Sequence, residues 1–230
     1  MPEWLQAWLW GAVAGSALLV GAAAGCLAPM PRRVIAAITS FGGGVLIAVL
    51  AFDLMEEAYE QAGYTATAIG FLGGGIAFTV ASLYLARVAA ARAHAAAAQP
   101  SGGRRPGGGV VIAVGSLLDS IPESVVIGLS LIEGGAVSWV TVVGITISNI
   151  PEGLTSADSM QQNGRSRRFI FGVWGSIAVV TSLASLAGYS IFGNFPLDVN
   201  AAVATVAAGA VLAMLATTML PEAFAGVRHV

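Results

Sequence analysis

Residues 110–131, VVIAVGSLLDSIPESVVIGLSL, and residues 137–158, VSWVTVVGITISNIPEGLTSAD, are neighbouring apolar stretches that each contain a proline followed by a glutamate. Their cores read Asp-Ser-Ile-Pro-Glu-Ser at 119–124 and Ser-Asn-Ile-Pro-Glu-Gly at 148–153. A charged side chain at bilayer depth is costly and usually marks an ion or substrate pathway. A proline inside a helix also leaves a backbone carbonyl without its usual donor. Two such motifs predict one site built from two helices.

The composition is that of a polytopic membrane protein. Of 230 residues, 57% are hydrophobic and 10% charged, and the mean hydropathy is +0.83, whereas soluble domains carry about 25% charged residues. A single cysteine, Cys26, excludes an internal disulfide. No cation precedes Arg32, so we expect the first apolar stretch to be a retained span and not a signal peptide.

Seven stretches reach the roughly 20 apolar residues that a membrane-spanning helix needs. We expect these spans at 4–27, 34–57, 66–88, 110–131, 137–158, 169–192 and 200–222. The sequence thus predicts one transmembrane domain over 1–230, of the all-α polytopic class.

The placement of the arginines predicts the orientation. The chain has no lysine, and its ten arginines fall between spans 1 and 2, around the end of span 3, between spans 5 and 6, or after span 7. Positive charge marks the cytoplasmic side, so we expect an extracytoplasmic N-terminus in the plasma (cell inner) membrane. The Ala-, Gly- and Arg-rich segment 89–109 is predicted to be a flexible cytoplasmic loop.

An internal repeat links span 2 to span 7. Residues 44–59, GVLIAVLAFDLMEEAY, align without a gap to residues 209–224, GAVLAMLATTMLPEAF, at an offset of 165. The paired spans cross the membrane in opposite directions, which is the pattern of an inverted repeat; a chance match between Ala- and Leu-rich helices is the alternative. The repeat predicts an eighth helix after span 7, which the chain, ending at Val230, has either lost or had truncated.

The two proline motifs gather oxygen atoms. Positions i, i+3 and i+4 share a helix face, and the residues on the two motif faces are Asp119, Ser120, Glu123, Ser148, Asn149 and Glu152. Carboxylates with other oxygen donors suit a divalent cation. The alternative is that the two glutamates are protonated and make structural hydrogen bonds between helices.

Further acids lie near the ends of spans 2 and 7. Asp53 and Glu57 lie toward the outer end of span 2, and Glu222 lies toward the inner end of span 7. We expect them to serve as an entrance and an exit for a cation, with solvated helix ends as the alternative. Three pairs of glycines at i, i+4 spacing predict close helix packing: Gly11/Gly15, Gly21/Gly25 and Gly70/Gly74.

The paired Pro-Glu motifs resemble those of the ZIP family of divalent-metal transporters, which carries a His-Asn-x-Pro-Glu-Gly type motif in two consecutive helices. The resemblance implies a 3+2+3 inverted-repeat bundle with seven spans visible here and metal bound between helices 4 and 5. It implies that Glu123 and Glu152 are metal ligands and that Ser120 and Asn149 occupy the second motif position. Asp119 and Ser148 stand where the family usually has histidine.

The replacement of these histidines bears on which metal the site would bind. No histidine lies in any predicted span, and zinc favours nitrogen and sulfur ligands. An oxygen-rich site therefore favours manganese or ferrous iron over zinc and leaves magnesium open.

The sequence-based hypothesis is transport of a divalent metal (zinc, or manganese or iron) toward the cytoplasm. The metal is the substrate, and we expect no organic cofactor, no enzymatic activity and no nucleic-acid partner. The expected partners are the cation and the lipid bilayer, and a homodimer is left open. One alternative is a non-transporting membrane protein with a structural or sensory metal site. Another is an intramembrane hydrolase using paired carboxylates such as Asp119 and Asp53.

Overall fold

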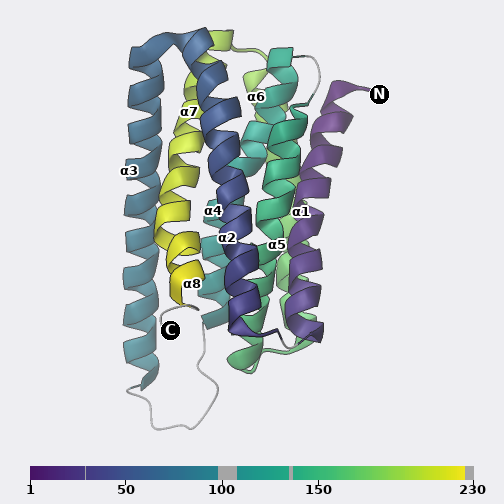
Figure 1. The fold of residues 1–230 in the computed structure, drawn as a ribbon, viewed down its shortest axis with the longest axis vertical. Helices are drawn as coiled ribbons and strands as arrows, with labels where there is room; N and C mark the ends of the chain where they lie inside the picture. Colours follow the sequence, from purple (N-terminus) through teal and green to yellow (C-terminus); the bar gives the residue numbers. More distant parts are fainter. Residues whose placement is uncertain (29, 98–107, 135–136, 226–230) are drawn as a thin grey trace.

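The computed structural model describes residues 1–28, 30–97, 108–134 and 137–225, and all regular structure in these ranges is helical (Figure 1). The α-helices are α1 (Glu3–Leu27), α2 (Arg32–Val49), α3 (Met55–Ala97), α4 (Gly108–Gly134), α5 (Trp139–Gln162), α6 (Arg167–Phe192), α7 (Leu197–Met214) and α8 (Leu220–Ala225). Two π-helical segments interrupt them, η1 (Leu50–Leu54) and η2 (Leu215–Met219). The predicted all-α class is thus confirmed for the described residues.

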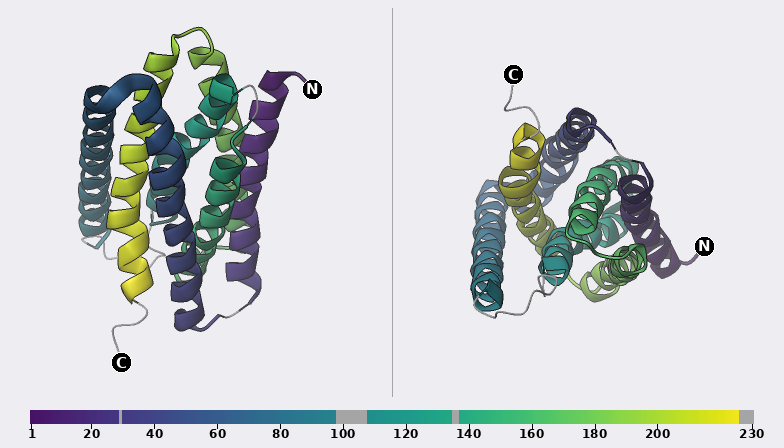
Figure 2. Two further views of the ribbon diagram at one scale, coloured as in Figure 1. Left: turned by 45° about the horizontal axis from the view of Figure 1, so that its top comes forward. Right: turned by 90° about the horizontal axis from the view of Figure 1, so that it is seen from below.

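The helices join into rods that run alternately up and down the bundle (Figures 1 and 2). α2, η1 and the first turns of α3 make one rod, and α7, η2 and α8 make another. Gly63 divides α3, because its φ of 74° lies in the left-handed region that glycine tolerates and other residues rarely adopt. The chain turns over there and descends through the rest of α3.

Five helical stretches of the described chain are long and apolar enough to cross a membrane: Glu3–Leu27, Arg32–Val88, Val114–Ile132, Arg167–Phe192 and Leu197–Met219. The second contains two of the predicted spans. The expected span at 137–158 is not among them, because polar residues such as Asn149 and Glu152 lower the mean hydropathy of α5. Large apolar side chains such as Phe52 (77% exposed) lie on the outside of the bundle, as in a helical membrane protein.

The charged residues separate between the two ends of the bundle. The arginines of the described chain lie where α1 meets α2, late in α3, and where α5 meets α6; we call this the arginine end. Glu3, Glu60 and Asp198 lie at the other end, which we call the acidic end. The predicted loop at 89–109 begins too early, since α3 continues to Ala97 through an alanine-rich sequence of high helix propensity. Residues 98–107 lie outside the described ranges.

The helices pack in two groups. α1, α4, α5 and α6 contact one another in one group, and α3 packs on α7 in the other, where η1 also contacts both α3 and α7. α2 lies between the groups, because it contacts α5 more extensively than α8. The groups meet mainly where α2 contacts α5 and where α4 contacts α7, as the view along the bundle shows (Figure 2).

Glycines bring the helices of the first group into backbone contact. Four glycines lie directly against carbonyl oxygens: Gly21 on Ile150 and Gly153 on Leu18 between α1 and α5, and Gly128 on Ser185 and Gly188 on Val125 between α4 and α6. The predicted packing role of the glycine pairs is confirmed, because Gly11 and Gly15 lie against α6, Gly21 and Gly25 against α5, and Gly70 and Gly74 against α7. Close approach through small residues is a main source of helix association in a bilayer.

The two π-helical segments fall at the same place in the internal repeat. Residues 50–54 of η1, advanced by the offset of 165, become residues 215–219 of η2. π-helices are rare and usually occur as single bulges at functional sites. The aligned segments therefore share a local backbone feature as well as residue identities.

We predict that Gly21→Ala destabilises the protein, because the added Cβ would collide with the Ile150 carbonyl oxygen. Overpacking of this kind costs about 1–3 kcal/mol, which thermal unfolding in detergent would register as a lower Tm. The matched control is Gly172→Ala in α6, where no atom lies within 4 Å of the added Cβ. It should leave Tm unchanged or raise it, because alanine is the better helix former.

Candidate functional site

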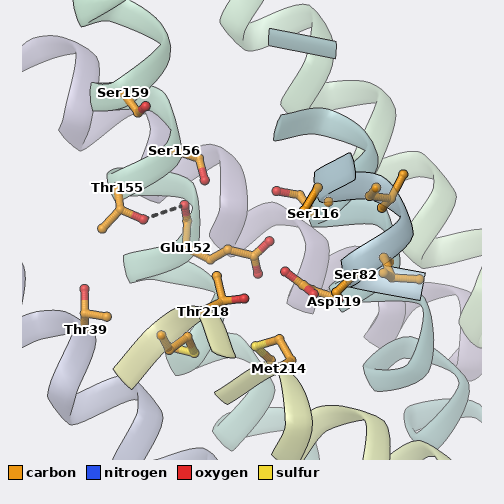
Figure 3. A pocket seen from close by; sticks show the side chains of 15 residues that line it. Thr39, Ser82, Ser116, Asp119, Glu152, Thr155, Ser156, Ser159, Met214 and Thr218 are labelled. Carbon is orange, nitrogen blue, oxygen red and sulfur yellow. Dashed lines mark hydrogen bonds between the residues drawn. The ribbon is translucent and has the colours of Figure 1, made fainter. Parts of the chain in front are cut away.

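A cavity of about 290 Å³ lies among the helices, lined by residues from the arginine-end halves of α2, α3, α4 and α5 together with the end of α7 and η2. Its lining includes Asp119 from α4 and Glu152 from α5. Figure 3 shows the two carboxylates pointing toward each other across the cavity. Each acid comes from one of the two proline motifs, so the structure brings one member of each motif together.

Hydroxyl groups surround the two carboxylates. The hydroxyl-bearing residues of the lining are Thr39, Ser82, Ser116, Thr155, Ser156, Ser159 and Thr218. Thr155 donates from its hydroxyl to the backbone oxygen of Glu152 at 3.3 Å. These hydroxyl-bearing residues were not predicted to belong to the site. Helical spacing could have found Ser116, which precedes Asp119 by three residues, and Thr155 and Ser156, which follow Glu152 by three and four.

Sulfur also reaches the cavity. Met214, the last residue of α7, and Met219, the last residue of η2, both belong to the lining. Figure 3 places Met214 close to Asp119 and Thr218. The expectation that the gathered ligands would be almost all oxygen is therefore incomplete, because thioethers are soft ligands.

Glu123 lies outside the cavity lining. It follows Asp119 by one helical turn, on the side away from the arginine end, and is only 2% exposed. Its Oε2 and the hydroxyl of Ser120 have no hydrogen-bond partner among the described residues. A buried carboxylate oxygen without a partner is costly. Glu123 thus requires a proton or a cation that the described side chains do not supply.

The side chains of the first two residues of the second motif, Ser148 and Asn149, donate hydrogen bonds to backbone oxygens. The Asn149 side chain donates through Nδ2 to the backbone oxygen of Ala14 at 2.9 Å, which ties α5 to α1. Its Oδ1 is buried without a partner in the described chain. Ser148 donates to the backbone oxygen of Ile145 at 2.9 Å within α5. Neither residue belongs to the cavity lining.

Asp53 lies in η1 and binds the start of α5 near the acidic end. Its Oδ2 accepts hydrogen bonds from the hydroxyl of Ser138, at 2.9 Å, and from the hydroxyl of Thr141. Ser138 is the N-cap of α5, and its Oγ also accepts from the backbone N–H of Thr141 at 3.2 Å. The carboxylate is therefore held by two hydroxyls at a helix N-terminus, where negative charge is favoured.

The remaining predicted acids are less informative. Glu57 is half-buried, and Gln61 donates to its Oε1 at 3.5 Å. Glu222 belongs to α8, and its side chain lies outside the described part of the structure.

The predicted ligands do not form one cluster. Within the described residues, no three Asp, Glu, His or Cys side chains come together as a metal-binding group. The acids separate into the cavity pair Asp119 and Glu152, the buried Glu123, and Asp53 at the start of α5. Acidic residues thus lie at three positions along the bundle.

The fold and the cavity define a helical membrane protein with an acidic, hydroxyl-rich cavity between its helices. No protein-family model matches the chain, and no curated protein matches it.

We predict that the cavity admits small reagents. In a Cys26→Ser background, Ser156→Cys would place a thiol in the cavity lining, where a small charged methanethiosulfonate should modify it. The control is Ser185→Cys in α6, at a position with no exposed surface, which should react at least about tenfold more slowly. Equal rates at the two positions, followed by mass spectrometry, would show that the cavity is closed.

Proposed function

We propose that the protein transports divalent metal cations through the bundle toward the arginine end, in the manner of the ZIP family that its motifs resemble. The observation that carries the proposal is the pair of carboxylates, Asp119 and Glu152, facing one another in a cavity between apolar helices. An ionised side chain placed at the centre of a membrane helix costs about 2.5–3.5 kcal/mol. Two acids from two helices are consistent with a bound cation that repays this cost.

The charge and size of the cavity support a cation as cargo. Among the described residues that line it, the charged ones are Asp119 and Glu152, so the lining favours positive charge. At about 290 Å³ the cavity exceeds by far the roughly 30 Å³ occupied by one water molecule. A hydrated or partly hydrated ion therefore fits the space.

The cavity donors narrow the class of metal. Carboxylates and hydroxyls suit manganese and ferrous iron, and the thioethers of Met214 and Met219 add affinity for softer ions such as zinc. We propose zinc, manganese and iron as the candidate substrates, bound without an organic cofactor.

The arrangement of the helices supports alternating access. The shared register of η1 and η2, in rods that run in opposite directions, favours an inverted repeat. Movement of the group containing α1, α4, α5 and α6 against the other group would then expose the site to each side in turn. We place the arginine end in the cytoplasm and the N-terminus outside the plasma (cell inner) membrane.

Uptake of metal into proteoliposomes tests the proposal. Asp119→Asn and Glu152→Gln each remove one charge from the cavity with little change of shape, so each should lower the uptake of manganese or zinc by at least about tenfold. The control Asp198→Asn removes an exposed acid at the acidic end and should leave uptake within about twofold of the parent.

Two outcomes would contradict transport. Undiminished uptake in the Asp119→Asn/Glu152→Gln double variant would exclude the cavity as the route. Metal binding by the purified protein without any flux would favour the alternative of a structural or sensory metal site.

A further inference from the structure

The internal repeats show that the two halves of the bundle differ in openness. Applied to the cavity lining, the offset of 29 between the proline motifs relates Glu152 to Glu123 and Thr155 to Val126, and the offset of 165 relates Met214 to Val49. Glu123 and Val126, in the half nearer the acidic end, are each 2% exposed, whereas their cavity counterparts Glu152 and Thr155 are half-buried; Met214 and Val49 are equally buried. The chain is thus open on the arginine side and packed shut at the equivalent positions on the acidic side.

At one further position, a hydroxyl of the cavity lining corresponds to a carboxylate on the acidic side. Thr218 of η2, a cavity residue, corresponds to Asp53 of η1 at the offset of 165. Each lies in the fourth position of its π-helical segment. Asp53 is half-buried and accepts hydrogen bonds from Ser138 and Thr141 at the first turn of α5.

These hydrogen bonds join the two helix groups. η1 contacts α3 and α7, which form one group, while Ser138 and Thr141 belong to the group that contains α5. α4 also meets α5 at this point, because the backbone N–H of Ser138 donates to the hydroxyl of Ser130 at 3.2 Å. Relative movement of the groups at the acidic end must therefore break the contacts of Asp53.

We infer that Asp53 closes the acidic side of the pathway by holding η1 to the start of α5, and that it lines the pathway when that side opens. In the opposite state its carboxylate would occupy the place that Thr218 occupies in the cavity seen here. The cation would then meet Asp53 and Glu123 on the acidic side and Asp119 and Glu152 on the arginine side. This inference rests on the proposed function, because it assigns Asp53 a gating role in that transport.

Site-directed modification tests the gate without requiring transport. In the Cys26→Ser background, Val126→Cys reports on the acidic side and Ser156→Cys reports on the arginine-side cavity. Thr141→Val removes one donor to Asp53 while keeping the shape of the side chain. A membrane-impermeant thiol reagent is applied to each face separately, in intact cells and in inverted vesicles.

The expected result is reciprocal. With Thr141→Val, the modification rate of Val126→Cys should rise by about tenfold, as fits the loss of one hydrogen bond to a carboxylate, and that of Ser156→Cys should fall. The matched control is Thr146→Val, on the same helix, whose hydroxyl donates to the backbone oxygen of Val142 within α5. It should change neither rate.

The result that would overturn the inference differs from failure of the proposed function. Unchanged modification rates at both reporters would exclude Asp53 as the gate. A rise at both reporters, as expected if the whole bundle is destabilised, would exclude it as well. A reciprocal change in a protein without metal uptake would instead uphold the gate and exclude transport of the metals tested.

Discussion

The direct contact of glycines with backbone carbonyls on neighbouring helices is the constraint on which the rest of the bundle depends. Lipid provides no hydrophobic force to drive one apolar helix against another, so association depends on close packing. Gly21 and Gly153 bring α1 and α5 together within the second proline motif, at Ile150 and at Gly153 itself, and Gly128 and Gly188 bring α4 and α6 together. The depth at which Asp119 and Glu152 face one another follows from these contacts.

Much of the fold could be predicted from the sequence because it depends on local patterns. The length of the apolar stretches predicted the helices. The placement of the arginines predicted that they lie at one end of the bundle, and the spacing of the glycines predicted which helix faces pack together. For the site, the motifs predicted one set of residues from two helices, and of these Asp119 and Glu152 line the same cavity. They could not show that Asn149 donates to the Ala14 backbone, or that Glu123 is buried outside the cavity, because both depend on partners distant in sequence.

The acids are distributed evenly although the motifs are not identical. On the arginine side the carboxylates come from the first and fifth positions of the quoted motif cores, as Asp119 and Glu152. On the acidic side Ser148 replaces the first acid, and Asp53 of η1 provides a second carboxylate beside Glu123 along the bundle. Each half therefore holds two acidic residues.

The two π-helical segments also bear on how the repeat arose. A π-turn contains one residue more than an α-turn and therefore acts as a one-residue insertion in a helix. The segments around Leu50 and Leu215 align without a gap, and identities continue beyond the bulges, where Glu57 matches Glu222. Were either bulge an ordinary α-turn, the register beyond it would shift by one residue. The additional residue is therefore present in both aligned segments.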